Sequence, residues 1–204
     1  MNEKFFELKK EKQDRMINGA LKVFALNGYK HASTDDIVAE AKISKGLLFH
    51  YFGSKIGLYE FLFDYASHFA VVELQSGVKT GETDYFRIQR QIASSETALQ
   101  KQYPYITMFL DSVLRETSEE ALGAVADSRG MVSDCYRNLL ANADYRAIGC
   151  GSADSEDAQM LSRLIDYTKQ GLLRSRLEDM NFSADDLEKE TDAYLDYLER
   201  LTKK

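Results

Sequence analysis

The hydrophobic and polar positions along the chain repeat with the period of a helix over most of its length. From Asp14 to Asn27, apolar residues fall at i, i+3, i+4 and i+7, which predicts a helix that buries one stripe. Gly28 follows at the position of a C-cap, so this first helix is expected to end there. Strand-like alternation is almost absent, and we therefore expect an all-α fold.

Three further helices are expected directly after the first, each opened by a hydroxyl-bearing cap. Thr34 caps the second, a short helix with two aspartates in its first turn, where the helix dipole favours negative charge. Ser44 is the expected N-cap of a third helix over 45–51. Ser54 opens a fourth, longer helix that reaches about Ser76.

The rest of the chain divides into further helices separated by turn-forming residues. The stretch "SGVKTGETD", residues 76–84, is the expected linker after the fourth helix, and Pro104 lies at a helix boundary. The expected later helices cover 85–102, 105–117, 119–143, 155–180 and 184–203. The pattern thus predicts about nine helices in all.

Composition narrows the class of protein. A chain of 204 residues can bury a substantial core, and its two cysteines, Cys135 and Cys150, are expected to be reduced structural thiols. The N-terminal stretch lacks the apolar region of a signal peptide, and no apolar run approaches the roughly 18 residues of a membrane span. We expect a soluble, cytoplasmic protein without a membrane partner.

The net charge of −7 is unevenly distributed. Residues 1–60 carry ten Lys and Arg against eight Asp and Glu, or +2, whereas residues 61–204 carry sixteen against twenty-five, or −9. A mildly basic head on an acidic body fits one DNA-facing end on a larger module. The lysines before the first helix are expected to form either a flexible DNA-contacting arm or a solvated tail.

The second and third helices, joined by a tight turn, have the spacing of a helix-turn-helix whose second helix can enter a major groove. Leu48 and Phe52 lie four residues apart and are expected to face the small core. The remaining residues of "SKGLLFHYF" are then left to the exposed sides: Lys45, Gly46, Leu47, Phe49, His50 and Tyr51.

The stretch "ALKVFALNGYKHASTDDIVAEAKISKGLLFHYFGSKIGLYEFL" resembles the tetracycline-repressor (TetR) family of transcriptional regulators. The resemblance extends over residues 11–65 and rests on the Asn-Gly-Tyr after the first helix, the Ser-Lys-Gly turn, the aromatic pair and the final Ser-Lys. It implies an N-terminal three-helix DNA-binding domain over 1–57. It further implies a helical ligand-binding and dimerisation domain over 58–204.

The resemblance implies roles for individual positions. Those that match the base-reading positions are Lys45, Gly46, Leu47 and His50. Those that match the phosphate-facing positions are Thr34, Ser44, Phe49, Tyr51 and Lys55. Lysine can donate to guanine O6 or N7, and hydroxyl groups suit phosphate oxygens, so the chemistry agrees for most of them.

Three positions depart from the usual pattern of the family. Phe49 replaces a frequent tyrosine and loses a phosphate hydrogen bond, while Leu47 replaces a frequent Thr or Ser and favours a thymine methyl contact. Lys42 stands in the turn where glycine is common, and a positive φ there would cost about 1 kcal/mol. These departures bear on the operator sequence rather than on the fold.

Two seams with 3.5-residue periodicity near the C-terminus predict helix pairing between two chains. The expected interface residues are Leu161, Ile165, Thr168, Leu172, Leu187, Thr191, Tyr194, Leu198 and Leu201. Paired across a two-fold axis, the two helices would form a four-helix bundle in a homodimer, and the operator would be a rough palindrome. The alternative is that these stripes pack only within one chain.

The resemblance also implies an apolar pocket for a small hydrophobic ligand between the head and the C-terminal seams. The candidate lining residues are Tyr103, Tyr105, Met108, Phe109, Met131 and Tyr136. Tyrosine and methionine suit such a ligand, but they suit an ordinary core equally well.

The expected function is that of a repressor that leaves a palindromic operator in double-stranded DNA when a small molecule binds. The alternatives are a helical adaptor or a regulator without an inducer. An enzyme is not expected, because the sequence has no nucleophile elbow, phosphate loop or metal-spaced His and Cys set. No cofactor or metal is expected either.

Overall fold

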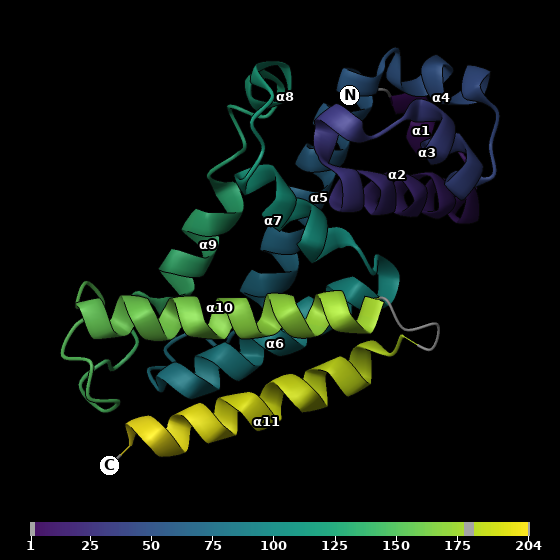
Figure 1. The fold of residues 1–204 in the computed structure, drawn as a ribbon. Helices are drawn as coiled ribbons and strands as arrows, with labels where there is room; N and C mark the ends of the chain where they lie inside the picture. Colours follow the sequence, from purple (N-terminus) through teal and green to yellow (C-terminus); the bar gives the residue numbers. More distant parts are fainter. Residues whose placement is uncertain (1–2, 178–181, 204) are drawn as a thin grey trace. The chain divides into compact units, whose positions relative to one another are not determined.

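The computed structural model describes residues 3–177 and 182–203, and within these ranges it forms eleven helices (Figure 1). They are α1 (Glu3–Phe6), α2 (Lys10–His31), α3 (Thr34–Ala41), α4 (Lys45–Phe52), α5 (Lys55–Gly77), α6 (Tyr85–Gln102), α7 (Ile106–Leu114), α8 (Glu119–Ala124), α9 (Met131–Leu140), α10 (Glu156–Leu177) and α11 (Ala184–Thr202). The predicted all-α class is confirmed.

The chain forms two compact units. The first unit comprises Met1–Phe69 and Gln102–Met131, and the second comprises Ala70–Lys101 and Val132–Lys204. Helices α2, α3, α4, α7 and α8 therefore belong to the first unit, and α6, α10 and α11 to the second, apart from Gln102 at the end of α6. Helix α5 contributes to both.

In the first unit, α2 and α3 approach each other closely at one glycine. A Cβ atom at Gly19 would lie 2.8 Å from the backbone nitrogen of Ala41, which is inside van der Waals contact. Gly19 is buried, as are Ala41 and the apolar stripe of α2 that includes Ile17 and Phe24. The absent side chain is therefore what lets α3 lie against α2.

Helix α2 is interrupted at Gly28, where the sequence predicts the end of the helix that begins near Asp14. Gly28 has a φ of 65° and a non-helical conformation, and the backbone N–H of Ala32 donates to its carbonyl. The opening of α3 differs from the prediction by one residue. Ser33 is the N-cap, because its hydroxyl accepts the N–H groups of Asp35 at 3.1 Å and Asp36 at 3.2 Å. Thr34 is instead the first helical residue.

An aromatic core joins α2, α5 and α7 within the first unit. The ring of Tyr59 lies 5.0 Å from that of Phe24 and 5.7 Å from that of Phe109, in edge-to-face arrangements. All three side chains are almost completely buried. Such pairs add stability beyond the burial of their area, so α7 packs as an integral part of the body that holds the helix-turn-helix.

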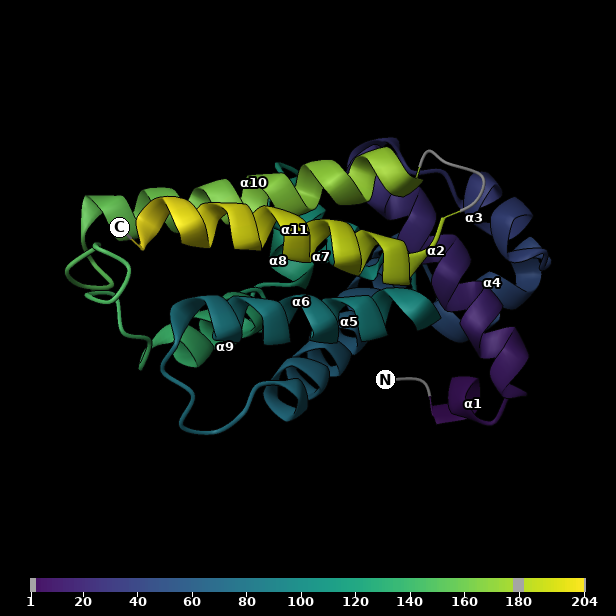
Figure 2. The same cartoon turned by 90° about the horizontal axis from the view of Figure 1, so that it is seen from below.

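In the second unit, α10 and α11 lie side by side and run in opposite directions (Figure 2). Leu161 and Ile165 of α10 are buried in a cluster with Tyr85 and Phe86 of α6 and with Leu195 of α11. A second cluster joins α5, α6 and α9 through residues such as Leu74, Ile88 and Cys135.

The predicted helix over 119–143 is wrong, because the structure divides it into α8 and α9. The connection between them includes Ser128, whose hydroxyl donates to the Asp64 carboxylate of α5 at 2.6 Å. Gly123 near the end of α8 and Gly130 just before α9 both have low helix propensity. The predicted continuous helix is thus broken in the segment where Ser128 bonds to α5.

The N-terminal segment is also more ordered than an arm or a solvated tail. It forms the short helix α1, and Phe5 within it has no exposed surface. A four-residue helix is too short to show periodicity in the sequence, so only its packing partners reveal it.

The close contact at Gly19 yields a stability prediction. Gly19→Ala should lower the free energy of unfolding by about 1–2 kcal/mol, because overpacking against the Ala41 backbone outweighs the gain in helix propensity. Gly46→Ala is the matched control, since an added Cβ there meets no atom within 4 Å. Urea unfolding followed by circular dichroism should show that variant to be at least as stable as the wild type. Equal stability of both variants would contradict the tight contact.

Candidate nucleic-acid interface

Helix α4 gathers most of the predicted DNA-facing residues on eight positions. Ser44 caps it, because its hydroxyl accepts the N–H of Leu47 at 3.2 Å, as predicted. Leu48 is its one buried residue, with 1% of its surface exposed. With Leu48 turned to the core, the opposite side of α4 is left open to a ligand.

The open side carries the residues predicted to read bases. Lys45, Gly46 and His50 are exposed, and Leu47 is half-buried. A Cβ at Gly46 would meet nothing within 4 Å, so the backbone there is accessible. The ammonium of Lys45, the imidazole of His50 and the exposed backbone at Gly46 place hydrogen-bond donors on one helix. A major groove is wide enough to admit such a helix.

Lys45 is held by a carboxylate at the start of α3. Its Nζ lies 2.8 Å from Oδ1 of Asp35, and the two side chains are 50% and 73% exposed. An ion pair as exposed as this one contributes about 0–1 kcal/mol, so a phosphate or a guanine can displace the carboxylate at small cost.

The turn between α3 and α4 contains Lys42 with a φ of 53° and a ψ of 50°. Lys42 therefore has the positive φ that was considered for this turn from the sequence. This conformation costs a non-glycine residue about 1 kcal/mol. The Lys42 side chain is exposed. Its charge in this turn is a second cation close to the start of α4.

The predicted phosphate-facing residues are placed less uniformly. Thr34, Phe49 and Tyr51 are half-buried, and Ser44 is exposed but uses its hydroxyl as the cap of α4. The Tyr51 ring packs edge to face against His50, with centroids 4.9 Å apart. Phe52, which was predicted to lie in the core, is only half-buried.

Lys55 makes contacts within the protein. Its Nζ donates to the carbonyl oxygens of Tyr29 at 2.8 Å and Ala32 at 3.1 Å, and it lies 4.2 Å from the centroid of the Tyr29 ring. It therefore ties the start of α5 to the end of α2. Because DNA would have to compete with two carbonyl groups, a direct phosphate contact by Lys55 stays a prediction.

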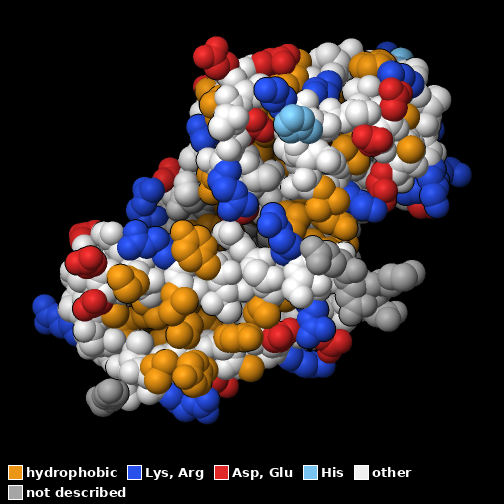
Figure 3. Space-filling view, in the orientation of Figure 1, with side chains coloured by type: hydrophobic (Ala, Val, Ile, Leu, Met, Phe, Trp, Pro, Cys, Tyr) orange, Lys and Arg blue, Asp and Glu red, His pale blue; other side chains and the backbone are white. Residues whose placement is uncertain are grey.

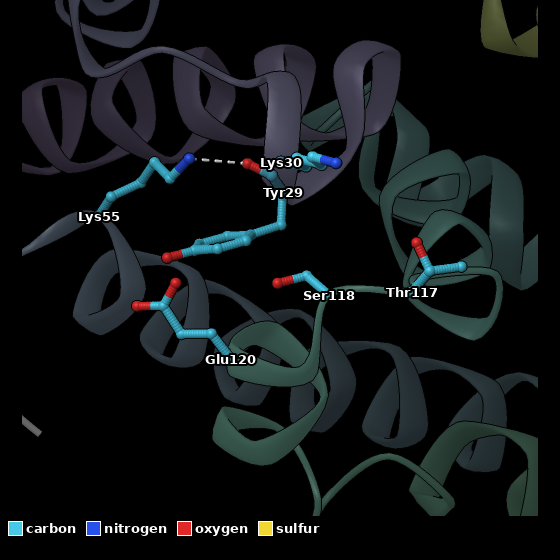
Figure 4. A pocket seen from close by; sticks show the side chains of 6 residues that line it. All are labelled: Tyr29, Lys30, Lys55, Thr117, Ser118 and Glu120. Atoms are coloured by element: carbon cyan, nitrogen blue, oxygen red, sulfur yellow. Dashed lines mark hydrogen bonds between the residues drawn. The ribbon is translucent and has the colours of Figure 1, made fainter.

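An open hollow of about 370 Å³ lies beside this lysine (Figure 4). Its lining residues are Tyr29, Lys30, Lys55, Thr117, Ser118 and Glu120. Burial, followed by a hydrogen bond to Glu120, raises the pKa of Tyr29 to about 12, so its phenol is neutral at physiological pH. None of the six predicted ligand-pocket residues lines this hollow.

Glu116 fastens the end of α7 to the end of α2. Burial alone would raise its pKa, but the N–H groups of Ser118, Tyr29 and Thr117 outweigh that effect and lower it. The bond from the Tyr29 N–H is 2.9 Å long. The ionised carboxylate thus satisfies a backbone donor next to the break at Gly28.

Three of the predicted pocket residues are buried in the first unit: Tyr103, Met108 and Phe109. The Tyr103 hydroxyl donates to Asp14 at 2.8 Å, accepts from Lys10 at 3.2 Å and lies 2.9 Å from the hydroxyl of Tyr65. Burial raises the pKa of Tyr103 well above its usual value, and the hydrogen bonds to Tyr65 and Asp14 raise it further. This residue connects α2 with α5 and the start of α7.

The other three predicted pocket residues are half-buried: Tyr105, Met131 and Tyr136. In the second unit, the Tyr136 hydroxyl donates to Oε1 of Glu96 at 2.7 Å, and Nζ of Lys169 lies 2.7 Å from Oε2. Burial, together with the charge of Glu96, raises the pKa of Tyr136. Three helices, α6, α9 and α10, thereby share one interior polar cluster.

The predicted dimer residues divide between the interior and the surface of the second unit. Leu161, Ile165, Leu187 and Thr191 are buried within the chain itself. Their burial within one chain agrees with the alternative that these stripes pack inside the chain, and their part in a dimer stays a prediction. Thr168, Leu172 and Leu198 are half-buried, and Tyr194 and Leu201 are exposed.

A different apolar stripe is exposed on α10 and α11. Its members are Met160, Leu164, Tyr167, Tyr194, Tyr197 and Leu201, each with 46–68% of its surface exposed. Hydrophobic side chains gather over these two helices in Figure 3. On α10 the sequence pattern did not single out this stripe. Met160 and Leu164 are four residues apart, and so are Leu161 and Ile165, which follow them by one residue and were predicted instead.

Within residues 3–177 and 182–203, no cluster of three or more His, Cys, Asp or Glu side chains is arranged to hold a metal ion. No helix in those ranges has the length and apolar character needed to cross a bilayer.

Comparison with known proteins places the helix-turn-helix in a family. The model of the bacterial regulatory proteins of the tetR family matches residues 16–62. Over 49 residues the chain is 49% identical to the uncharacterized HTH-type transcriptional regulator YuxN of Bacillus subtilis (strain 168). The match covers 24% of this chain and 17% of the length of that regulator.

Solved structures extend the similarity to the whole fold. A TetR family transcriptional regulator from Chloroflexus aurantiacus J-10-FL has a TM-score of 0.61 at 21% identity, with 99% of this chain and 98% of that chain covered. FadR from Bacillus subtilis, solved in complex with stearoyl-CoA, has a TM-score of 0.56 at 18% identity, with 89% and 96% covered. The family match, the capped α4 and this shared fold agree. The helix-turn-helix of this chain, within residues 16–62, is that of the TetR family of transcriptional regulators, and the chain shares the fold of solved regulators of that family.

Proposed function

We propose that this regulator is a homodimeric repressor that reads a two-fold symmetric operator through α4 and releases it when a small molecule binds. The observation that carries the proposal is the arrangement of α4, which buries Leu48 and leaves Lys45, Gly46 and His50 exposed. We assign DNA binding to residues 1–57, and dimerisation and effector binding to 58–204.

Base reading is assigned to Lys45, Gly46, Leu47 and His50, and backbone contact to Thr34, Ser44, Phe49 and Tyr51. The exposed N-terminal turn of α4 supports this division, since N–H groups and a lysine at a helix start suit phosphate and guanine. Leu47 adds an apolar contact suited to a thymine methyl group. Lys42, exposed in the preceding turn, joins this set as a further phosphate partner.

The dimer is assigned to the exposed stripe of α10 and α11. Its six members lie at 160–167 of α10 and at 194–201 of α11, which the opposite directions of the two helices bring toward the same end. Contiguous apolar surface of this kind is typical of association sites. Two copies meeting at this stripe would form a four-helix bundle and present two α4 helices to one duplex.

The effector is assigned to a hydrophobic small molecule. Its support is the fold shared with FadR, which was solved with stearoyl-CoA. One observation favours a regulator without an inducer. Tyr103 and Phe109 already fill interior positions and act as ordinary core, with the Tyr103 hydroxyl bonded to its neighbours.

Lys45→Ala and His50→Ala should each weaken binding to a duplex selected from a random library by about 1–3 kcal/mol, because each removes a base-edge contact. Lys79→Ala, which removes an exposed lysine from the loop after α5, is the matched control and should leave affinity unchanged. Gel-shift titration at one fixed salt concentration measures all three. Wild-type affinity in both α4 variants would contradict the assignment.

Leu164→Glu should raise the dissociation constant of the dimer by about 30-fold or more, because it buries a charge in an apolar contact. Gln159→Glu adds the same charge at an exposed position outside the stripe on the same helix, and it should leave the dimer intact. Sedimentation velocity over a range of concentrations distinguishes the two. A Leu164→Glu protein that stays dimeric would rule out this stripe as the interface.

A further inference from the structure

The N-terminal segment packs against the helix that is proposed to read DNA. Phe5 of α1 is completely buried. Its ring centroid lies 5.9 Å from that of Tyr51 and 5.3 Å from that of Phe52, which form the end of α4. A third contact, of 5.1 Å, joins it to Phe61 of α5. One aromatic side chain thus joins the last turn of α4 to α5.

The segment is itself fastened to α2. The Nε2 group of Gln13 donates to the carbonyl oxygens of Phe6 at 3.0 Å and Leu8 at 2.8 Å. Gln13 is buried, with 8% of its surface exposed, so these bonds satisfy an amide that water does not reach. The position of Phe5 is therefore set by a built connection to the helix-turn-helix body.

Helix α4 needs such an external support. It is eight residues long, and Leu48 is the only residue that it buries fully. Ser44 holds its first turn through a cap. A helix of this length is marginal without tertiary packing, and one buried leucine leaves its far end able to tilt. Two rings pack on that end: Phe61, whose centroid lies 5.0 Å from that of Phe52, and Phe5, which contacts both Phe52 and Tyr51.

We propose that Phe5 is a positioning residue for DNA reading, which fixes the last turn of α4 so that its exposed face meets the base edges in one orientation. The inference rests on the proposed role of α4. Residues 3–8 lie outside the 16–62 region that matches the family model, so this support is not part of that match. Fixing α4 in advance strengthens specific binding, because less ordering remains to be done on the DNA.

The test compares two neighbouring phenylalanines in the full-length protein. Phe6 is the matched control, since its ring is 42% exposed and its described contacts are with Phe5, Phe61 and Tyr65, outside α4. The probes are a duplex selected by the wild type from a random library and a scrambled duplex of the same composition. Hydrogen exchange of the α4 amides is measured in parallel.

Phe5→Ala should weaken binding to the selected duplex by about 10-fold, while binding to the scrambled duplex, which depends mainly on charge, changes by less than about 2-fold. Its α4 amides should exchange faster than those of the wild type. Phe6→Ala should stay within about 2-fold on both duplexes, and Phe5→Leu should recover most of the loss. Should Phe5→Ala fail to fold, Phe5→Leu provides the same comparison with a smaller loss.

Wild-type affinity and wild-type α4 exchange in Phe5→Ala would overturn the inference. An equal loss on both duplexes would also overturn it, because that pattern shows general destabilisation. If the wild type enriched no duplex at all, the proposed function would fail instead, and the exchange of the α4 amides would still decide whether Phe5 holds that helix.

Discussion

Helix α4 cannot be stable alone, and the packing of the first unit around it follows from that constraint. An eight-residue helix in water gains too few hydrogen bonds to offset the cost of nucleation. Leu48 anchors α4 to the core, Ser44 caps its start and Phe5 packs on its end. Because the support comes from behind and from the ends, the outward face is left to Lys45, Gly46 and His50.

The body behind α4 is larger than three helices. Helix α7 shares an aromatic core with α2 and α5, and Glu116 just after it accepts the N–H of Tyr29. The compact unit that holds the helix-turn-helix therefore includes residues 102–131. In the proposed mechanism, an effector bound in the second unit would act on α4 through the chain segments that enter this body, with α5 as the continuous helix.

Local signals in the sequence predicted the elements that short-range chemistry decides. Ser44 as a cap, Leu48 as the inward residue and the bounds 85–102 of α6 depend on neighbours in the chain, and they agree with the structure. The break between α8 and α9, the burial of Phe5 and the ties of Lys55 depend on partners far along the chain. Helical spacing carries no information about these partners.

The helix pair at the C-terminus shows the same limit. Two adjacent stripes on α10 are apolar, and the contacts of Leu161 and Ile165 with Tyr85 and Phe86 turn one of them inward. Periodicity predicted an apolar seam on α10 but could not distinguish the two apolar stripes of that helix. The structure of α4 was easier to predict, because the motif around it combines a cap, a buried residue and an exposed charge in nine positions.

Dimethyl sulfate footprinting of the selected duplex tests the central claim most directly, because guanine N7 lies in the major groove. Two α4 helices of a symmetric dimer should protect two clusters of guanines whose centres are separated by about 10.5 base pairs or a multiple of it. Protection in a single cluster, or tight binding with every guanine N7 still reactive, would contradict the account.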